Sequence, residues 1–236
     1  MGNRRAFLMA LAGLPAWRAA AVLAGWLAEM QADAQANAQA NTPVDEPPDT
    51  TTDFAAVRPG QRLVFPRDHG AHPDFRNEWW YATGWLSLPD GSPLGFQSTF
   101  FRVRTGIGEA NPSAFAPRQL VIAHAAIADP QLGRLRHDQR AARTGFGRAG
   151  FASGQTGVWI GDWRFAQEGE RYRAEVRAAD FSYALTLVAD SPPLLNGLSG
   201  YSVKAPDPRH ASYYYSRPQL AASGSVTRAG RAQAVR

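Results

Sequence analysis

The most conspicuous chemical group in the chain is an acid that directly precedes a run of aromatic residues. Residues 74–86 read "DFRNEWWYATGWL", with Glu78 immediately before Trp79, Trp80 and Tyr81. A carboxyl group placed against indole rings loses hydration, which favours its protonated form and suits it to donate a proton to an alkene or to activate water. Glu78 is therefore a candidate catalytic acid.

The same glutamate has a structural interpretation. An arginine such as Arg76 or Arg102 could pair with it and fix the entrance of the strand. Arg102 lies on the predicted neighbouring strand, where a cross-strand charge pair stabilises a sheet. The sequence leaves both interpretations of Glu78 open, and Arg102 is included among the candidate ligand-binding residues.

A second catalytic candidate is His124, which lies in the apolar segment "VIAHAAI". Alternation places it on the same strand face as Leu120 and Ile122. Its imidazole titrates near neutral pH and could move a proton if it met Glu78 or a tyrosine in a cavity. The alternative is a histidine that belongs to the core.

Aromatic residues supply the candidate ligand-binding surface. Trp79, Trp80 and Tyr81 are joined by Tyr213 and Tyr215 of "ASYYYSRPQL" at 211–220. Tyrosine can line an apolar pocket while its hydroxyl makes a hydrogen bond. The alternative is a Tyr-rich strand that packs against the Trp-rich strand.

Two further groups of residues resemble sites but lack supporting features. His69 and His72 in "RDHGAH" stand three apart next to Asp68, but Gly70 and Pro73 indicate a loop, and we predict no metal site there, only a loop that closes one end of the fold. Ser202 and Lys204 are spaced as a Ser–Lys pair, yet no G-x-S-x-G turn accompanies them. No cofactor is expected.

Composition limits the class of protein. Among 236 residues, 44% are hydrophobic and 19% charged, which is globular, and 22 Gly with 17 Pro favour a turn-rich β fold over a helical bundle. The absence of Cys excludes disulfides, thiolate metal sites and a Cys nucleophile. The net charge of +5 is carried by scattered arginines, so we predict no nucleic-acid partner.

The N-terminal 40 residues are predicted to be an export signal. "RRAFL" resembles the twin-arginine signature, an apolar stretch follows, and either Ala34-Gln35-Ala36 or Ala38-Gln39-Ala40 fits a cleavage site. The alternatives are an ordinary secretory signal and an uncleaved anchor. Pro15 and Arg18 argue against a lasting membrane span, so the mature protein is expected in the periplasm or outside the cell. Residues 41–61, rich in Pro, Thr and Asp, are predicted to be a linker.

The elements that must position these residues are short alternating segments separated by turns. Strands are expected at 78–88, 94–104, 118–128, 157–166, 171–178, 180–189, 211–218 and 221–227. No sustained amphipathic helix follows residue 40, so the strands must be antiparallel. Both faces of the segment at 78–86 are apolar and need cover. An all-β antiparallel barrel or sandwich is the predicted fold.

Four blocks resemble a known family. They are "FPRDHGAHPDFRNEWWYATGWL" (65–86), "GFQSTFFRVR" (95–104), "FAPRQLVIAHAAIAD" (115–129) and "GLSGYSVKAPDPRHASYYYSRPQL" (197–220). In this order they are similar to the AttH/carotenoid 1,2-hydratase family of secreted, lipocalin-like proteins. The resemblance implies two lipocalin-like domains. Residues 62–228 would form the first, and residues 229–236 would begin a second that this chain lacks.

The resemblance also implies an activity, the addition of water across a terminal double bond of an acyclic carotenoid without a redox cofactor. We therefore expect a periplasmic protein that binds an apolar isoprenoid- or lipid-like ligand. Hydration would use Glu78 or His124 to move the proton, with Trp and Tyr rings stabilising a cationic intermediate. The alternatives are a non-catalytic carrier, a secreted ester hydrolase of the kind that the family's "secreted hydrolase" description implies, or a remnant without function. No motif indicates an oligomeric state.

Overall fold

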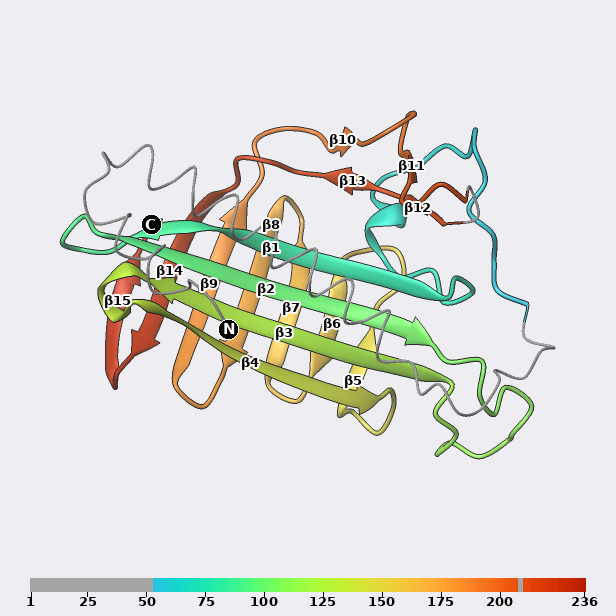
Figure 1. Cartoon of the computed structure of the whole chain (residues 1–236), viewed down its shortest axis with the longest axis horizontal. Coiled ribbons are helices and arrows are strands. Elements are labelled where there is room, and N and C mark those ends of the chain that lie inside the picture. The colour runs from blue at the N-terminus through green and yellow to red at the C-terminus, as the bar shows by residue number, and fades with distance from the viewer. Residues whose placement is uncertain (1–52, 208–209) are drawn as a thin grey trace.

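The computed structural model describes residues 53–207 and 210–236, and over these ranges the chain is an all-β protein, as predicted (Figure 1). The predicted export signal and the linker up to residue 52 lie outside the described residues. Helical structure within the described ranges is limited to two three-residue turns, η1 (Arg67–His69) and η2 (Pro130–Leu132). None of the helices found there has the length or the apolar character to cross a membrane.

The strands follow the chain in numerical order. They are β1 (Asn77–Ser87), β2 (Pro93–Arg104), β3 (Gln119–Asp129), β4 (Arg134–Arg143), β5 (Ala149–Phe151), β6 (Gly157–Ile160), β7 (Trp163–Glu168), β8 (Arg171–Arg177), β9 (Phe181–Val188), β10 (Leu194–Leu195), β11 (Tyr201–Val203), β12 (Ala211–Tyr213), β13 (Tyr215–Ser216), β14 (Ala221–Arg228) and β15 (Arg231–Val235).

The first sheet is an antiparallel meander in the order β1-β2-β3-β4. Its first hairpin turns at the predicted "PDG" segment, where Gly91 adopts a φ of 81° and the amide of Ser92 donates to the Asp90 carboxylate at 2.9 Å. The register places Glu78 opposite Arg102 and Trp80 opposite Phe100. Alternate residues of β1 therefore face opposite sides of the sheet.

The second sheet has the order β15-β14-β9-β8-β7-β6-β5. Its strands run across those of the first sheet, so the two sheets form a sandwich with crossed strands (Figure 1). At one corner the sheets adjoin, where the backbone N–H of Arg236 donates to the carbonyl of Ser87 at 3.2 Å. Of the two predicted forms, the lipocalin-like sandwich is the one observed, because the sheets do not close into a barrel.

The strand prediction is wrong in several details, since two predicted strands are divided and several observed strands, among them β4, β5, β10 and β11, were not predicted. A turn at Gly161 (φ 61°) and Asp162 divides the predicted strand 157–166 into β6 and β7. The predicted strand 211–218 is divided at Tyr214 into β12 and β13. Strand β4 was not predicted, because its sequence "RLRHDQRAAR" has no apolar alternation; it is the exposed edge of its sheet, where charged residues are usual.

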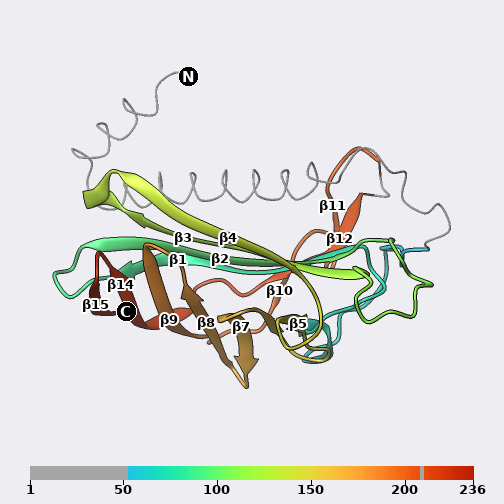
Figure 2. The same cartoon turned by 90° about the horizontal axis from the view of Figure 1, so that it is seen from below.

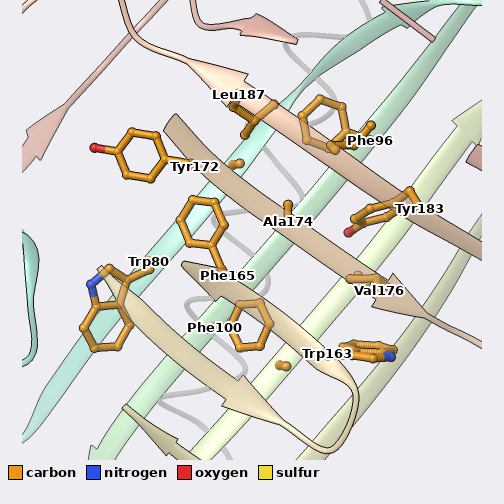
Figure 3. Packing of buried hydrophobic residues seen from close by; sticks show 14 of the residues in the cluster. Trp80, Phe96, Phe100, Trp163, Phe165, Tyr172, Ala174, Val176, Tyr183 and Leu187 are labelled. Carbon is orange, nitrogen blue, oxygen red and sulfur yellow. The ribbon is translucent and has the colours of Figure 1, made fainter. Parts of the chain in front are cut away.

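The core lies between the two sheets and is built from aromatic and aliphatic residues of both. Figure 3 shows Trp80, Phe96 and Phe100 of the first sheet packed with Trp163, Phe165 and Tyr183 of the second. The hydroxyl of Tyr183 donates to the carbonyl of Gln97 at 2.7 Å, which ties the sheets together at a polar point inside the core. The core thus fixes the inward face of β1.

The segment that carries β10 to β13 lies along the free edge of β1. We call residues 194–207 and 210–216 the strap. Figure 2 shows β11 and β12 on the side of the first sheet that faces away from β7 and β8. The strap is joined to β1 by a hydrogen bond between the hydroxyls of Tyr81 and Tyr214, so it forms a wall next to that strand.

Candidate functional site

A large cleft runs along β1 and the strap. Its volume is about 3000 Å³, and its lining includes Trp79, Trp80, Tyr81, Tyr213 and Tyr215 among the predicted ligand-binding residues. Both predicted catalytic residues, Glu78 and His124, also line it. Arg102 does not, because its side chain is fully buried behind the wall.

The acid Glu78 forms an ion pair with Arg102, as the structural interpretation predicted. Arg102 Nε donates to Glu78 Oε2 at 2.7 Å. The rest of the guanidinium donates to backbone carbonyls of the preceding loop, those of His72 at 3.1 Å and Phe75 at 2.7 Å. Burial lowers the pKa of Arg102, and these acceptors compensate its charge. Arg102 therefore fixes the loop before β1.

A histidine that sequence reasoning did not connect with Glu78 completes this group. The backbone N–H of His72 donates to both carboxylate oxygens at 2.8 Å, and its ring Nδ1 lies 2.8 Å from Glu78 Oε1. The hydrogen bond with Glu78 raises the pKa of His72 above its usual value, against the effect of burial. We call Glu78, His72 and Arg102 the clamp.

The clamp continues to a second acid. His72 Nε2 lies 3.3 Å from Asp68 Oδ1, and Arg67 Nε donates to the same oxygen at 2.6 Å. Burial alone would raise the pKa of Asp68, but hydrogen bonds from Arg67, the Val64 amide and His72 lower it to about 2. His72 is thus held between two carboxylates, which favour its protonated form, and its side chain is 36% exposed and lines the cleft.

The loop that carries these residues needs a glycine. A Cβ at Gly70 would overlap the backbone nitrogen of Gly154, because the loop lies directly against residues 152–156. The amide of Ala71 donates to the carbonyl of Ala152 at 2.9 Å in the same contact. Only glycine allows this approach, so Gly70 sets the position of His69 and His72.

His69, in the same loop, is buried. Its Nδ1 is 2.9 Å from the hydroxyl of Tyr215, and its carbonyl accepts a hydrogen bond from Trp80 Nε1 at 3.0 Å. Burial, with the charge of Arg217, lowers the pKa of His69, and burial raises that of Tyr215. This is a pair of neutral groups, in contrast to the charged clamp.

The outer face of β1, opposite to the inner face that carries Glu78 and Trp80, has exposed or half-exposed aromatic rings. Tyr81 and Tyr214 share a hydrogen bond of 2.6 Å between their hydroxyls, and the rings of Trp79 and Tyr214 lie 6.3 Å apart. Trp85, on the same face, is 58% exposed. Tyr213 lies beside this group and exchanges hydrogen bonds with the backbone of Arg58.

His124 is also on this outer face, opposite Thr99 and Gln139 in the register. Burial, with the neighbouring His137, lowers its pKa, and its ring contacts Phe101 edge-on at 5.8 Å. Glu78 lies on the inner face of the same sheet, since its register partner is Arg102. The structure therefore does not bring the two predicted catalytic residues together.

Neither of the weaker patterns forms a site within the described residues. Lys204 Nζ lies 4.3 Å from the ring centroid of Tyr214, and no hydrogen bond joins it to Ser202. Asp68 and His72 contact each other through the clamp, but no group of three or more possible metal ligands is found over residues 53–207 and 210–236. The sequence did contain a signal for the contact between His72 and Glu78. The two residues are only six positions apart, and the loop between them contains Pro73.

Comparison with known proteins gives one family and one fold. A family model described as AttH-like matches residues 56–236. A crystal structure of a protein described as AttH from Nitrosomonas europaea is 49% identical, with a TM-score of 0.70 over 77% of this chain and 55% of its own. Kievitone hydratase from Nectria haematococca is 11% identical, with a TM-score of 0.52 over 78% of this chain and 51% of its own, a likeness of fold.

The chain thus spans about half the length of these two solved structures. No curated protein matches it.

Proposed function

The chain belongs to the AttH-like family, and from this premise we propose that it binds an apolar, isoprenoid- or lipid-like ligand in the cleft along β1. One observation carries the proposal, the cleft of about 3000 Å³ walled by Trp and Tyr side chains from β1 and the strap. The predicted export signal adds a compartment, the periplasm or the cell exterior.

The size and chemistry of the lining favour a long, apolar molecule. Sites for small ligands usually have volumes of about 300–1,000 Å³, so this cleft has room for an extended chain. Its two carboxylates nearest the aromatic wall, Asp68 and Glu78, already accept hydrogen bonds from Arg67, His72 and Arg102. What remains for a ligand is mainly aromatic surface, with tyrosine hydroxyls as polar points.

The geometry also supports acid-assisted hydration, with His72 in the place that the sequence assigned to Glu78. Both oxygens of Glu78 accept hydrogen bonds from groups of the clamp, so its carboxylate is already engaged by His72 and Arg102. His72 is the group whose charged form is favoured and whose side chain is partly open to the cleft. It would act as the proton donor.

In this reaction the imidazolium of His72 transfers a proton to the less substituted carbon of the terminal double bond, which leaves a tertiary carbocation on the other carbon of that bond. Water then adds to the cation and loses a proton to the neutral imidazole. Aromatic ring faces of the cleft lining would stabilise the cation. Because the chain spans about half of its solved relatives, the hydration step is proposed for the whole protein.

Ligand binding is tested by titrating the protein with lycopene in detergent and following the quenching of tryptophan fluorescence. We expect saturable binding that weakens about tenfold in Trp79→Ala, since a buried aromatic contact contributes about 1.5 kcal/mol or more. Phe115→Ala is the matched control, because Phe115 is 63% exposed and lies outside the cleft. Equal weakening in both variants, or no binding, would contradict the proposal.

Hydration is tested by incubating the whole protein with lycopene in ¹⁸O-labelled water and measuring the label in a hydroxylated product by mass spectrometry. We expect His72→Gln to abolish the product while lycopene binding persists. Binding without any product in the unaltered protein would instead support the non-catalytic carrier. Unchanged turnover in His72→Gln would remove His72 from the reaction.

A further inference from the structure

We infer that the protein docks on an anionic phospholipid bilayer through two loops at one end of the first sheet. Residues 105–118 join β2 to β3, and residues 143–148 run from the end of β4 to β5, at the same end of that sheet (Figure 1). We call these residues the end loops. The inference goes beyond the proposed function and stands without it, because docking needs no ligand in the cleft.

Two exposed phenylalanines form the apolar part of the end loops. Phe115 is 63% exposed and Phe146 is 61% exposed, and their rings stack with centroids 4.9 Å apart. Phe146 has a φ of 54°, a backbone conformation that costs free energy for a bulky residue. Single apolar residues in solvent are common, but adjacent aromatic rings exposed together indicate a surface that contacts another molecule.

Arginines surround these rings. The guanidinium of Arg143 lies 4.6 Å from the ring centroid of Phe115 and 5.4 Å from that of Phe146. Its Nη1 also donates to the carbonyl of Phe115 at 2.7 Å, which holds the two loops together. Arg148 lines the same hollow, and Arg118 ends the longer loop. None of these three arginines pairs with a carboxylate of the described residues.

The charge of the end loops is therefore positive and uncompensated. Their sequence contains one acid, Glu109, and Arg104 of β2 already pairs with it at 3.1 Å. The net charge of +5 on the whole chain acts in the same direction. The end loops thus present phenylalanine rings and free cations side by side.

An anionic bilayer matches both properties. Aromatic rings insert at the boundary between head groups and acyl chains, while arginine side chains extend to the phosphates. Each arginine near such a surface is attracted by its negative potential. A protein partner fits less well, because a stable protein interface covers about 800 Å² on each partner, far more than two rings on loop tips provide.

The end loops also adjoin one end of the cleft. Thr105, Ile107 and Pro117 line the cleft, and Ile107 is exposed. The two arms of the longer loop lie next to each other, since a Cβ at Gly108 would be 3.6 Å from that of Ala116. Docking would therefore bring this end of the cleft to the bilayer, where an apolar ligand of the proposed kind is dissolved.

The experiment measures cosedimentation of the full chain with vesicles, in the absence of any carotenoid. Vesicles of phosphatidylcholine with about one-third phosphatidylglycerol are compared with phosphatidylcholine alone, and we expect tighter binding to the anionic vesicles. Phe115→Ser/Phe146→Ser should weaken it about tenfold, because the rings no longer leave water. Arg148→Ala should weaken it about fivefold through the lost charge. High salt should also weaken it.

Leu132→Ser and Arg134→Ala are the matched controls, because both residues are exposed at the opposite end of the first sheet. Both should bind vesicles as the unaltered protein does. The series is repeated without residues 1–40, because the predicted export signal is itself apolar and would bind lipid. Lycopene binding in detergent should be unchanged in Phe115→Ser/Phe146→Ser, which shows that this variant folds.

Three results would overturn the inference: no preference for anionic vesicles, equal weakening in the controls, or loss of all binding without residues 1–40. Self-association that needs Phe115 and Phe146, without vesicle binding, would assign the end loops to a protein partner and overturn it as well. Each of these results leaves lycopene binding in detergent unaffected, so failure of docking is distinguishable from failure of the proposed function.

Discussion

The two faces of β1 carry side chains of similar size that differ in their hydrogen bonding and in their exposure. On the inner face, Glu78 and Trp80 make hydrogen bonds to fixed partners, Arg102 and the carbonyl of His69. On the outer face, Trp79 and Tyr81 are half-buried and Trp85 is 58% exposed. One strand thus carries a hydrogen-bonded polar network, which reaches the cleft at His72, on one face and a more exposed aromatic surface on the other.

The difference follows from the costs of burial. A buried guanidinium such as that of Arg102 is tolerated only when acceptors surround it, and Glu78 and backbone carbonyls supply them on the inner face. Large exposed aromatic groups are unusual on a soluble surface and mark sites of contact with other molecules. The acid that drew attention in the sequence therefore stabilises the fold, and the rings around it form the candidate binding surface.

The largest effect should come from breaking the inner face. Arg102→Met removes the cation and leaves Glu78 without its main partner in a buried position, which costs about 3–5 kcal/mol of unfolding free energy. Urea denaturation measures this loss. The double variant Arg102→Met/Glu78→Gln should recover part of it, and Trp85→Ser on the outer face should cost less than about 1 kcal/mol. Equal losses for Arg102→Met and Trp85→Ser would refute the contrast between the faces.

A smaller effect is expected from the link between the outer face and the strap. Tyr81→Phe and Tyr214→Phe each remove the hydroxyl hydrogen bond, which contributes about 0.5–1.5 kcal/mol. The double variant should cost little more than either single variant, because both lose the same interaction. A double-mutant cycle measured by urea denaturation tests this. Fully additive losses would show that the two hydroxyls act independently.

The smallest effect concerns the pH dependence of the clamp. The pKa of His72 is raised in the folded protein, so its contribution to stability is full below the unfolded value, about 6.5, and is lost as the pH rises through the raised folded pKa. Because the ring is 36% exposed, solvent screening limits the loss to a few tenths of a kcal/mol. His72→Gln should remove this dependence from urea midpoints measured between pH 6 and 9.

Asp68 provides an internal contrast for that measurement. Its pKa is lowered to about 2, so its contribution is complete above its unfolded value and is lost only as the pH falls toward 2. A decline between pH 6 and 9 that persists in His72→Gln would show that another group is responsible.

Much of the fold was predictable from the sequence because it depends on local patterns. The alternation at 78–88 and 94–104 and the turn at Asp90 and Gly91 define the first hairpin, and its register then places Arg102 opposite Glu78. Strand β4 was not predicted, because a strand at the exposed edge of a sheet needs no apolar alternation. Local pattern specifies a strand only where one face of it is buried.

The candidate site was predictable only in part. Its aromatic residues stood out by composition, but the partner of Glu78 depends on a loop that turns back over β1, and its position is set by the contact of Gly70 with Gly154. His124 and Glu78 lie on opposite faces of the sheet. This follows from the registers in which β1 pairs with β2 and β2 pairs with β3, and both registers are needed to predict it. Such relations depend on tertiary structure and leave no local signal.

The strap also has a consequence for the order in which the protein folds. Its contacts with the first sheet join Tyr214 to Tyr81 and Tyr215 to His69 across 133 and 146 residues, whereas the four-stranded sheet is a meander of neighbouring hairpins. Closing a longer loop costs more chain entropy, so local hairpins form before distant contacts. Until the strap arrives, β1 is an uncovered edge strand with Trp79 and Tyr81 in solvent, and the chain is most prone to intermolecular strand pairing during that interval.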